Sequence, residues 1–377
     1  FTLTVNVYAN GKVVTGELNT DTTLANLELT GCTLEPAFDS SIEEYSCSVN
    51  NSVEETIITG SATSNTTKIS GLGTKSLSVG DNTFIIKTLA ENGDEKTYTV
   101  KVNRKKVLQN ISIFGKQFEV LDEEPTLTMT SLEAGDEDGL YKSTATNSGD
   151  ATYYFRGNVE NNYVSFAGQT WRIIRINEDG TIRLIMQDGI NNNTSYKIYT
   201  SSYQGYTNMY YSNSKAVSYL KSWYDTNLSS YGDYIYESGS YCEQMKVHAS
   251  TYNSGDSNAK LIADYIPDFR CSTDANSKGI ITSSIGLISI DEALYAGAYY
   301  LKVNDNFYLA TSSAMFTMSP AGIAKQNDNS SIWRIYNNRL TYGNGLDYGA
   351  VLKPVINLKS DVKATGSGTS SSPFIIQ

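Results

Sequence analysis

Two adjacent carboxylates, Asp291 and Glu292, are the first candidates for chemistry in this sequence. They open an apolar run within ISIDEALYAGAYYL, residues 288–301, and a carboxylate pair can hydrolyse glycans if both groups flank one glycosidic bond. On a helix, however, neighbouring side chains diverge by about 100°. Ser289 precedes Glu292 by three residues, which is the spacing of a capping box, and Asp291 suits the positive end of the helix dipole. The pattern therefore favours a structural cap at Ser289 and Glu292 over a catalytic pair.

Cysteine is the other residue type that could act as a nucleophile. The single histidine, His248, follows Cys242 by six residues, so a Cys–His dyad is conceivable. The four cysteines, however, form two local pairs, one in each half of the chain, without the C-x-x-C spacing of a zinc or redox motif. This pattern predicts disulfides Cys32–Cys47 and Cys242–Cys271 and an oxidising compartment, and four free buried thiols are the alternative. A disulfide sulfur is no nucleophile, so we identify no catalytic residue and do not expect an enzyme.

Three Asx-rich turns are the candidates for a metal site: NEDG at 177–180, VNDN at 303–306 and QNDN at 326–329. None matches the calcium loop D-x-[DN]-x-[DN]-G with its distant glutamate. Asn, Asp and Gly are also the residues that tight turns require. We therefore expect ordinary turns, no metal and no cofactor.

A tyrosine-rich stretch, YKIYTSSYQGYTNMYY at 196–211, is the remaining candidate site. Its rings recur among small polar residues without an apolar period. Such a stretch is either an ordinary surface connection or a loop that presents flat amphipathic rings to sugars or peptides. In the second case we expect Tyr203, Tyr206, Tyr210 and Tyr211 to contact the ligand.

Composition limits the class of partner. The chain has 377 residues, enough for two or three domains, and carries a net charge of −11, which argues against nucleic-acid binding. No run of 18 apolar residues occurs, so we expect no membrane insertion within this chain. A glycan or a protein of a host or neighbouring cell is the partner class that we expect.

The chain divides into segments that differ in residue composition and hydrophobic pattern. Residues 1–20 read as a hairpin turning at Asn10-Gly11, or as a remnant of a preceding domain, and residues 21–104 show only strand signals. Residues 105–130 read as a connector with a strand or two, in NISIFG and LTMTSL. Residues 131–377 predict an α+β domain with the hairpin TWRIIRINEDGTIRLIM, in which we expect Trp171 to be core. That domain should also hold one helix with Val217, Leu220, Trp223 and Tyr224 at helical spacing and a second after Ser289.

The segment 21–104 resembles the cadherin-like β-sandwich module of bacterial surface proteins. The resemblance lies in LANLELTGCTLEPAFDSSIEEYSCSV and GLGTKSLSVGDNTFIIKTLAENGDEKTYTVKV, through Leu27, Leu29, Gly31, Leu34, Pro36, Phe38, Tyr45, Gly80, Asn82, Thr83, Tyr98, Val100 and Val102. It implies an antiparallel sandwich and an extracellular spacer or adhesive role. The resemblance does not imply a calcium site, because the sequence has no acidic cluster at the domain junction.

The segment 131–377 resembles an uncharacterised domain of surface and secreted proteins of Gram-positive bacteria. The resemblance lies in WRIIRIN, IGLISIDEALYAG and LKPVINL, which occur in this order. The order of Trp hairpin, two helices and late strands also resembles C-type-lectin-like folds, including those related to formylglycine-generating enzymes. These resemblances imply related surface proteins and a fold for this segment, but they do not imply a ligand.

We therefore expect a secreted or cell-surface bacterial protein in which an all-β sandwich is followed by a larger α+β domain. A non-enzymatic binding or adhesion module is the leading hypothesis, favoured by a polar, tyrosine-lined concavity. A stalk or filament subunit is the alternative, favoured by a large exposed apolar patch. An enzyme with carboxylate-based glycan hydrolysis is the second alternative, favoured by a buried carboxylate of raised pKa in a cleft.

Overall fold

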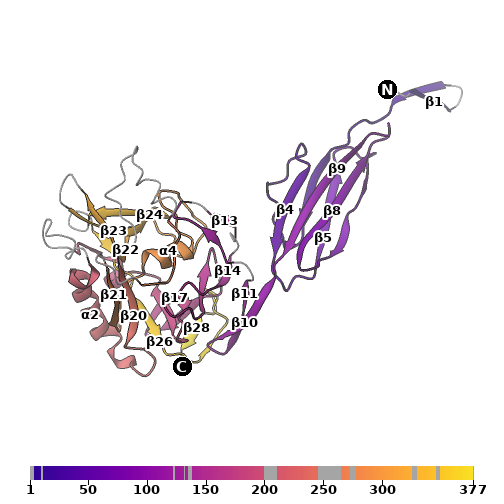
Figure 1. The fold of residues 1–377 in the computed structure, drawn as a ribbon. Helices are drawn as coiled ribbons and strands as arrows, with labels where there is room; N and C mark the ends of the chain where they lie inside the picture. Colours follow the sequence, from indigo (N-terminus) through magenta and orange to yellow (C-terminus); the bar gives the residue numbers. More distant parts are fainter. Residues whose placement is uncertain are drawn as a thin grey trace. The chain divides into compact units, whose positions relative to one another are not determined.

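The computed structural model describes residues 4–9, 12–121, 124–130, 132–134, 138–198, 210–244, 265–271, 277–324, 329–344 and 349–376. The chain forms two compact units, Phe1–Leu108 and Gln109–Gln377, and strands dominate both (Figure 1). Within the described ranges no helix is long and apolar enough to cross a membrane.

A separate hairpin begins the first unit. Strand β1 (Thr4–Ala9) pairs antiparallel with β2 (Lys12–Glu17), with Ala9 opposite Lys12 at the turn. This antiparallel pairing agrees with the hairpin expected for residues 1–20, and Asn10 and Gly11 themselves lie outside the described residues.

Two facing sheets make up the rest of the first unit. One has the strand order β3-β5-β7 and the other β4-β9-β8-β6. Buried side chains of both sheets form one core between them, as expected for a β-sandwich. The strands are β3 (Leu24–Leu29), β4 (Glu44–Val49), β5 (Glu55–Ala62), β6 (Lys68–Ser70), β7 (Gly73–Ser76), β8 (Gly80–Leu89) and β9 (Glu95–Arg104).

Strand β9 shows why the alternation in the sequence is informative. Tyr98, Val100 and Val102 are fully buried, whereas Lys101 on the opposite face is exposed. The sandwich is not wholly antiparallel, because β4 runs parallel to β9. After β3 the chain crosses to the other sheet instead of turning back, so a hairpin between β3 and β4 does not form. The Cys32–Cys47 disulfide joins the end of β3 to β4 across the sandwich.

A ten-stranded sheet organises the second unit. Its main path is β10-β11-β14-β15-β17-β16-β28-β27, and β18 joins it by pairing with both β17 and β26. The strands are β10 (Val107–Ile113), β11 (Lys116–Leu121), β14 (Gly139–Ser143), β15 (Thr152–Arg156), β16 (Tyr163–Phe166), β17 (Gln169–Ile176), β18 (Ile182–Met186), β26 (Val355–Leu358), β27 (Ala364–Thr365) and β28 (Phe374–Ile376).

The segment 105–130, expected to be a connector with a strand or two, contributes two strands to this sheet. It supplies β10 and β11, and its side chains Ile113, Phe118 and Val120 are buried in the core of the second unit. Because these residues lose apolar surface to that core, the division between the units falls at Leu108.

Smaller sheets and short helices complete the second unit. A five-stranded sheet has the order β19-β25-β22-β23-β24, and β20 pairs with β21 and β12 with β13. The strands are β12 (Thr126–Leu127), β13 (Leu132–Ala134), β19 (Ser195–Tyr196), β20 (Gly239–Gln244), β21 (Ser277–Ser283), β22 (Met315–Ala324), β23 (Asn329–Tyr336), β24 (Arg339–Asn344) and β25 (Ala350–Val351). The helices are α1 (Ile190–Asn193), α2 (Lys215–Asn227), α4 (Ile290–Ala296) and the 3-10 turns η2 (Tyr211–Asn213) and η3 (Ser229–Tyr231).

Both expected helices are present. In α2 the side chains of Leu220, Trp223 and Tyr224 are buried and Val217 packs against the same core, as their spacing predicted. The second, α4, follows Ser289.

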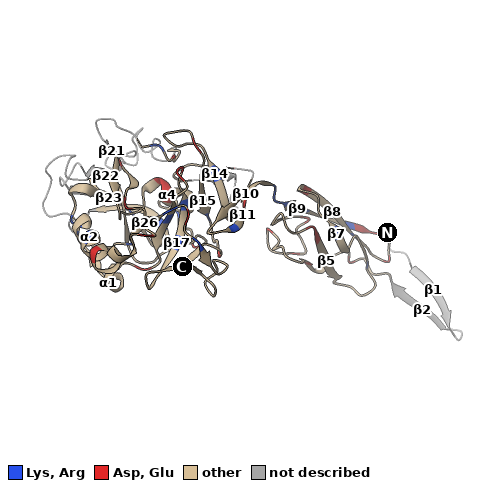
Figure 2. Ribbon diagram, turned by 90° about the horizontal axis from the view of Figure 1, so that it is seen from below, with Lys and Arg blue, Asp and Glu red and all other residues tan. Residues whose placement is uncertain are grey.

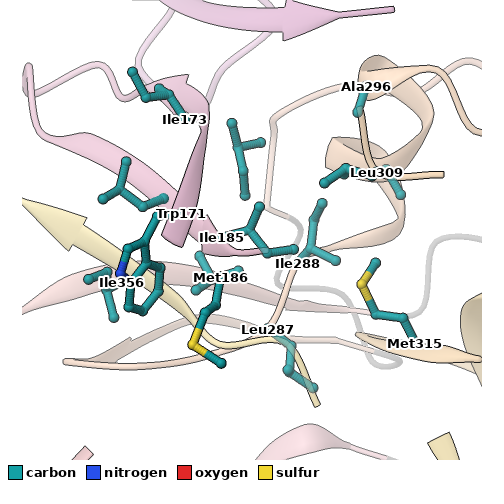
Figure 3. Packing of buried hydrophobic residues seen from close by; sticks show 14 of the residues in the cluster. Trp171, Ile173, Ile185, Met186, Leu287, Ile288, Ala296, Leu309, Met315 and Ile356 are labelled. Atoms are coloured by element: carbon teal, nitrogen blue, oxygen red, sulfur yellow. The ribbon is translucent and has the colours of Figure 1, made fainter. Parts of the chain in front are cut away.

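The core of the second unit lies between the large sheet and the segment that carries α4. Figure 3 shows Trp171, Ile185 and Met186 from β17 and β18 near Leu287 and Ile288, which precede α4. Trp171 is fully buried, as expected. All five residues of β18 are buried, so this strand is covered on both faces, which its alternation alone did not indicate.

Each unit holds one disulfide, Cys32–Cys47 in the first and Cys242–Cys271 in the second, in the predicted pairing. We expect non-reducing peptide mass mapping of the intact chain to recover these two cross-linked peptides and no free thiol. A cross-link between the two units, or alkylation of any cysteine without prior reduction, would contradict the pairing and the oxidising compartment that it indicates.

Candidate functional site

The acidic segment at the start of α4 forms the predicted capping box. The backbone N–H of Glu292 donates to the Ser289 hydroxyl at 3.2 Å, and the Ser289 N–H donates to the Glu292 carboxylate at 3.0 Å. Two backbone donors at the start of the helix are thereby satisfied by side chains. The cap prediction at Ser289 and Glu292 is confirmed.

The opposite end of α4 is also satisfied within the core. Gly297 ends the helix with a φ of 124°, a conformation that favours glycine. Arg156 of β15 donates from Nη1 to the carbonyls of Leu294 and Tyr295, both at 3.1 Å, and from Nη2 to the Tyr299 hydroxyl at 2.7 Å. A fully buried cation therefore lies at the negative end of a helix whose seven residues are all buried.

We expect Ser289→Ala to lower the free energy of unfolding by about 1 kcal/mol, the usual effect of losing an N-cap oxygen. Ser289→Thr keeps the acceptor and serves as the matched control. Urea unfolding followed by tryptophan fluorescence measures the effect in the second unit alone, because all three tryptophans, Trp171, Trp223 and Trp333, lie there. Equal stability of the alanine variant and the wild type would show that the cap contributes nothing.

Glu292 has a second role that its position in a cap does not require. Its Oε1 lies 2.6 Å from the Nε of Arg183 on β18 and 3.7 Å from the Nε of Arg175 on β17. The contact with Arg183 is an ion pair whose N–H direction does not meet hydrogen-bond geometry. The side chains of Glu292 and Arg183 are only 4% and 2% exposed, so these charges interact with little screening by water. Figure 2 shows the acidic turn of α4 in red and basic residues of nearby strands in blue.

The surroundings of Glu292 keep it ionised. Burial by itself raises the pKa of this carboxyl, but the charges of Arg183 and Arg175 and the hydrogen bonds with Ser289 outweigh burial, so the pKa lies below its ordinary value. A general acid in glycan hydrolysis needs the opposite shift. Glu292 is therefore suited to act as a counterion and poorly suited to donate a proton.

Asp291 is buried as well, and it binds different partners. Its Oδ1 accepts a hydrogen bond from the Tyr265 hydroxyl at 2.6 Å and one from the Asp268 N–H at 3.2 Å. Burial and the adjacent Asp291 charge together raise the pKa of Tyr265, so the phenol remains a donor. Asp291 thus holds the segment 265–271 against α4, beyond its effect on the helix dipole.

A small polar pocket of about 30 Å³ lies at the start of α4. This volume accommodates one or two water molecules or one small ionic group. Five parts of the chain contribute to its wall, and the Cys242–Cys271 disulfide ties two of them together, β20 and the segment 265–271. The lining residues are Arg175, Arg183, Ser240, Cys242, Asp268, Phe269, Arg270, Ser289, Asp291 and Glu292.

The sandwich of the first unit is similar to a known domain family. Its residues 20–105 match the cadherin-like beta sandwich domain. The comparison with curated proteins found no match, and neither did the comparison with solved structures. Nothing in these comparisons supports the resemblance of residues 131–377 to an uncharacterised domain of Gram-positive surface proteins.

The cadherin-like domain and the described part of the second unit contain no group of three or more His, Cys, Asp or Glu side chains that could hold a metal. Several oxygens of the Asx-rich turns accept hydrogen bonds within the turn. Asp179 Oδ1 accepts from both the N–H and the hydroxyl of Thr181, and Asn304 Oδ1 accepts from the N–H of Asn306. Most of the third turn, 326–329, lies outside the described residues.

The tyrosines expected to contact a ligand are not together on the described surface. Tyr203 and Tyr206 lie outside the described residues, as does His248. Tyr210 and Tyr211 are only 4% and 3% exposed, so little of either ring is accessible to a ligand in this structure. Both residues lie just before α2, and Tyr211 begins the 3-10 turn η2. The Tyr211 ring packs into the core of the second unit, where burial of its apolar surface is favourable.

The sequence interpretation missed Arg175 and Arg183 as site residues. Each stands within an apolar strand, in WRIIRI and TIRLIM, where a charged residue breaks an otherwise hydrophobic run. A charge at a buried strand position needs a partner, and this signal could have identified both residues. The partner itself was not predictable from spacing, because Glu292 is distant in the sequence.

Proposed function

We propose that this chain is an extracellular binding protein of the adhesion type without enzymatic activity. The match of residues 20–105 to the cadherin-like beta sandwich domain carries this proposal, because that domain is consistent with an adhesion-type module outside the cell. A cell-surface location in Gram-positive bacteria, with a glycan or a protein of another cell as ligand, is part of the proposal.

Two further observations support it. Both units hold a disulfide, which suits an oxidising, extracellular compartment. In addition, the buried carboxylate Glu292 has a lowered pKa, the reverse of what an acid catalyst requires. The second unit then provides the ligand-contacting surface and the sandwich acts as a spacer.

The test measures binding of the whole chain, with its disulfides intact, to immobilised bacterial cell walls and host cell surfaces. Biolayer interferometry records the binding. Saturable retention that soluble wall or host glycan, or protease treatment of the cells, abolishes is the expected result. An unrelated protein of similar negative charge controls for electrostatic adsorption, since this chain carries a net charge of −11.

Two outcomes would contradict the proposal. Concentration-dependent assembly into long polymers in sedimentation experiments, with no retention on cells, would identify a stalk or filament subunit. Release of reducing sugar from the same glycans, lost on substitution of a single carboxylate, would identify an enzyme.

A further inference from the structure

We infer that the pocket at the start of α4 binds the carboxylate group of a ligand, and that Arg175 receives it. This inference rests on the proposed binding function, since it names the chemical class of the ligand. Its evidence is the geometry around Arg175, the small volume of the pocket and the way its wall is braced.

Arg175 is a buried guanidinium without a hydrogen-bond acceptor among the described residues. Its side chain is 11% exposed and lines the pocket, and its Nε is fully enclosed without a hydrogen-bond partner. Glu292 is the carboxylate beside it, and the 3.7 Å between the two atoms is too long for a hydrogen bond. Burial also lowers the pKa of Arg175, which reflects the cost of enclosing this charge. Such a group favours an incoming acceptor.

The wall of the pocket holds three arginines and three carboxylates, and these charges are unevenly paired. Arg175 and Arg183 share the single carboxylate of Glu292. Arg183 is better satisfied, because its Nη1 donates to the carbonyl of Ser240 at 3.0 Å. Arg175 is therefore the arginine of this pair without a hydrogen-bond acceptor, and an incoming carboxylate would supply one.

The other two acids of the wall already accept hydrogen bonds from the protein. Asp291 accepts from Tyr265 and from the Asp268 N–H, and Asp268 accepts from the Arg270 N–H at 2.8 Å. Arg270 adds a third positive charge to the wall. One oxygen of each acid, Asp291 Oδ1 and Asp268 Oδ1, is thus already engaged by the segment 265–271.

The size and shape of the site favour a carboxylate. A volume of about 30 Å³ admits a carboxylate group while the rest of its ligand stays outside. The planar guanidinium of Arg175 lies over the ring of Phe269, 4.7 Å from the ring centre, so its orientation is set before a ligand arrives. A fixed guanidinium and a planar carboxylate can form two parallel hydrogen bonds. The Cys242–Cys271 disulfide holds Phe269 and its neighbours in place.

The test is calorimetric titration of the intact chain at constant ionic strength with three carboxylates: acetate, glucuronate and N-acetyl-aspartate. The uncharged analogues acetamide and glucose are the ligand controls. We expect saturable binding of at least one carboxylate and none of the uncharged analogues. Preference for glucuronate would indicate an acidic sugar as the source, and preference for N-acetyl-aspartate an acidic peptide.

Arg175→Gln should weaken carboxylate binding by about tenfold or more, as expected for the loss of charge-assisted hydrogen bonds. Its melting temperature should stay the same or rise, because Glu292 keeps Arg183 as its partner. Arg339→Gln is the matched control: Arg339 lies on β24 outside the pocket wall, and its Nε also lacks a hydrogen-bond partner. This variant should bind like the wild type.

Absence of saturable binding for all three carboxylates would overturn the inference, and so would equal losses in Arg175→Gln and Arg339→Gln. These results are separable from those on adhesion. Retention on cells without carboxylate binding would remove the pocket inference alone. Carboxylate binding without retention on any surface would instead remove the proposed adhesion.

Discussion

Glu292→Gln is expected to lower the free energy of unfolding of the second unit by about 3–5 kcal/mol, because it leaves buried arginines without their counterion. Glutamine can still accept the hydrogen bond from the Ser289 N–H, so the cap alone would predict a smaller loss than that of Ser289→Ala. The ion pairs with Arg183 and Arg175 reverse this order. Urea unfolding followed by tryptophan fluorescence at neutral pH measures the difference.

Asp225→Asn is the matched control for this variant. Asp225 pairs with Lys221 on α2 at 3.2 Å, but both side chains are more than half exposed, so water screens the pair and little change is expected. If Glu292→Gln proved no less stable than Ser289→Ala, the arginines would not depend on Glu292. Our assignment of Glu292 as their counterion would then be incorrect.

The effect of Glu292→Gln should also depend on pH in a defined direction. The folded pKa of Glu292 is lower than its ordinary value of 4.5, so the ionised group stabilises the folded state. This contribution is fully present above pH 4.5 and is lost as the pH falls through the lower folded pKa. The stability difference between wild type and variant should therefore be constant near neutrality and shrink in acid. A difference that grows in acid would contradict the lowered pKa.

Tyr211→Ala is expected to destabilise the second unit by about 3–5 kcal/mol, the usual loss when a large buried aromatic side chain is truncated. The ring is 3% exposed and belongs to the main core, next to the start of α2. A ligand-contacting tyrosine on the surface would behave differently, because its removal would reduce binding and leave the melting temperature nearly unchanged. Thermal melting followed by circular dichroism decides between the two.

Tyr236→Ala is the control for this substitution. Tyr236 is 36% exposed and belongs to the same unit, so its truncation removes less buried surface and should shift the melting temperature much less. Equal shifts for the two variants would show that burial of Tyr211 does not stabilise the domain. A melting temperature of Tyr211→Ala equal to that of the wild type would restore Tyr211 as a candidate contact residue.

The sequence by itself determined the features that depend on neighbours in the chain. The alternation in KTYTVKVN placed Tyr98, Val100 and Val102 in the sandwich core, since a strand has a side-chain period of two. The three-residue spacing of Ser289 and Glu292 specified the cap, because its hydrogen bonds form within one helical turn. Short cysteine separations likewise indicated both disulfides.

Only the tertiary structure decided which distant segments meet. The sequence indicated strand character within β10, but the place of β10 and β11 in the large sheet depends on partners elsewhere in the second unit. The same holds for Glu292: its local spacing specifies a cap, yet the fold also brings it to Arg175 of β17 and Arg183 of β18. Periodicity and capping report local geometry, whereas burial of a charge depends on the whole core. That burial makes Glu292 a counterion and leaves the Nε of Arg175 without a hydrogen-bond acceptor.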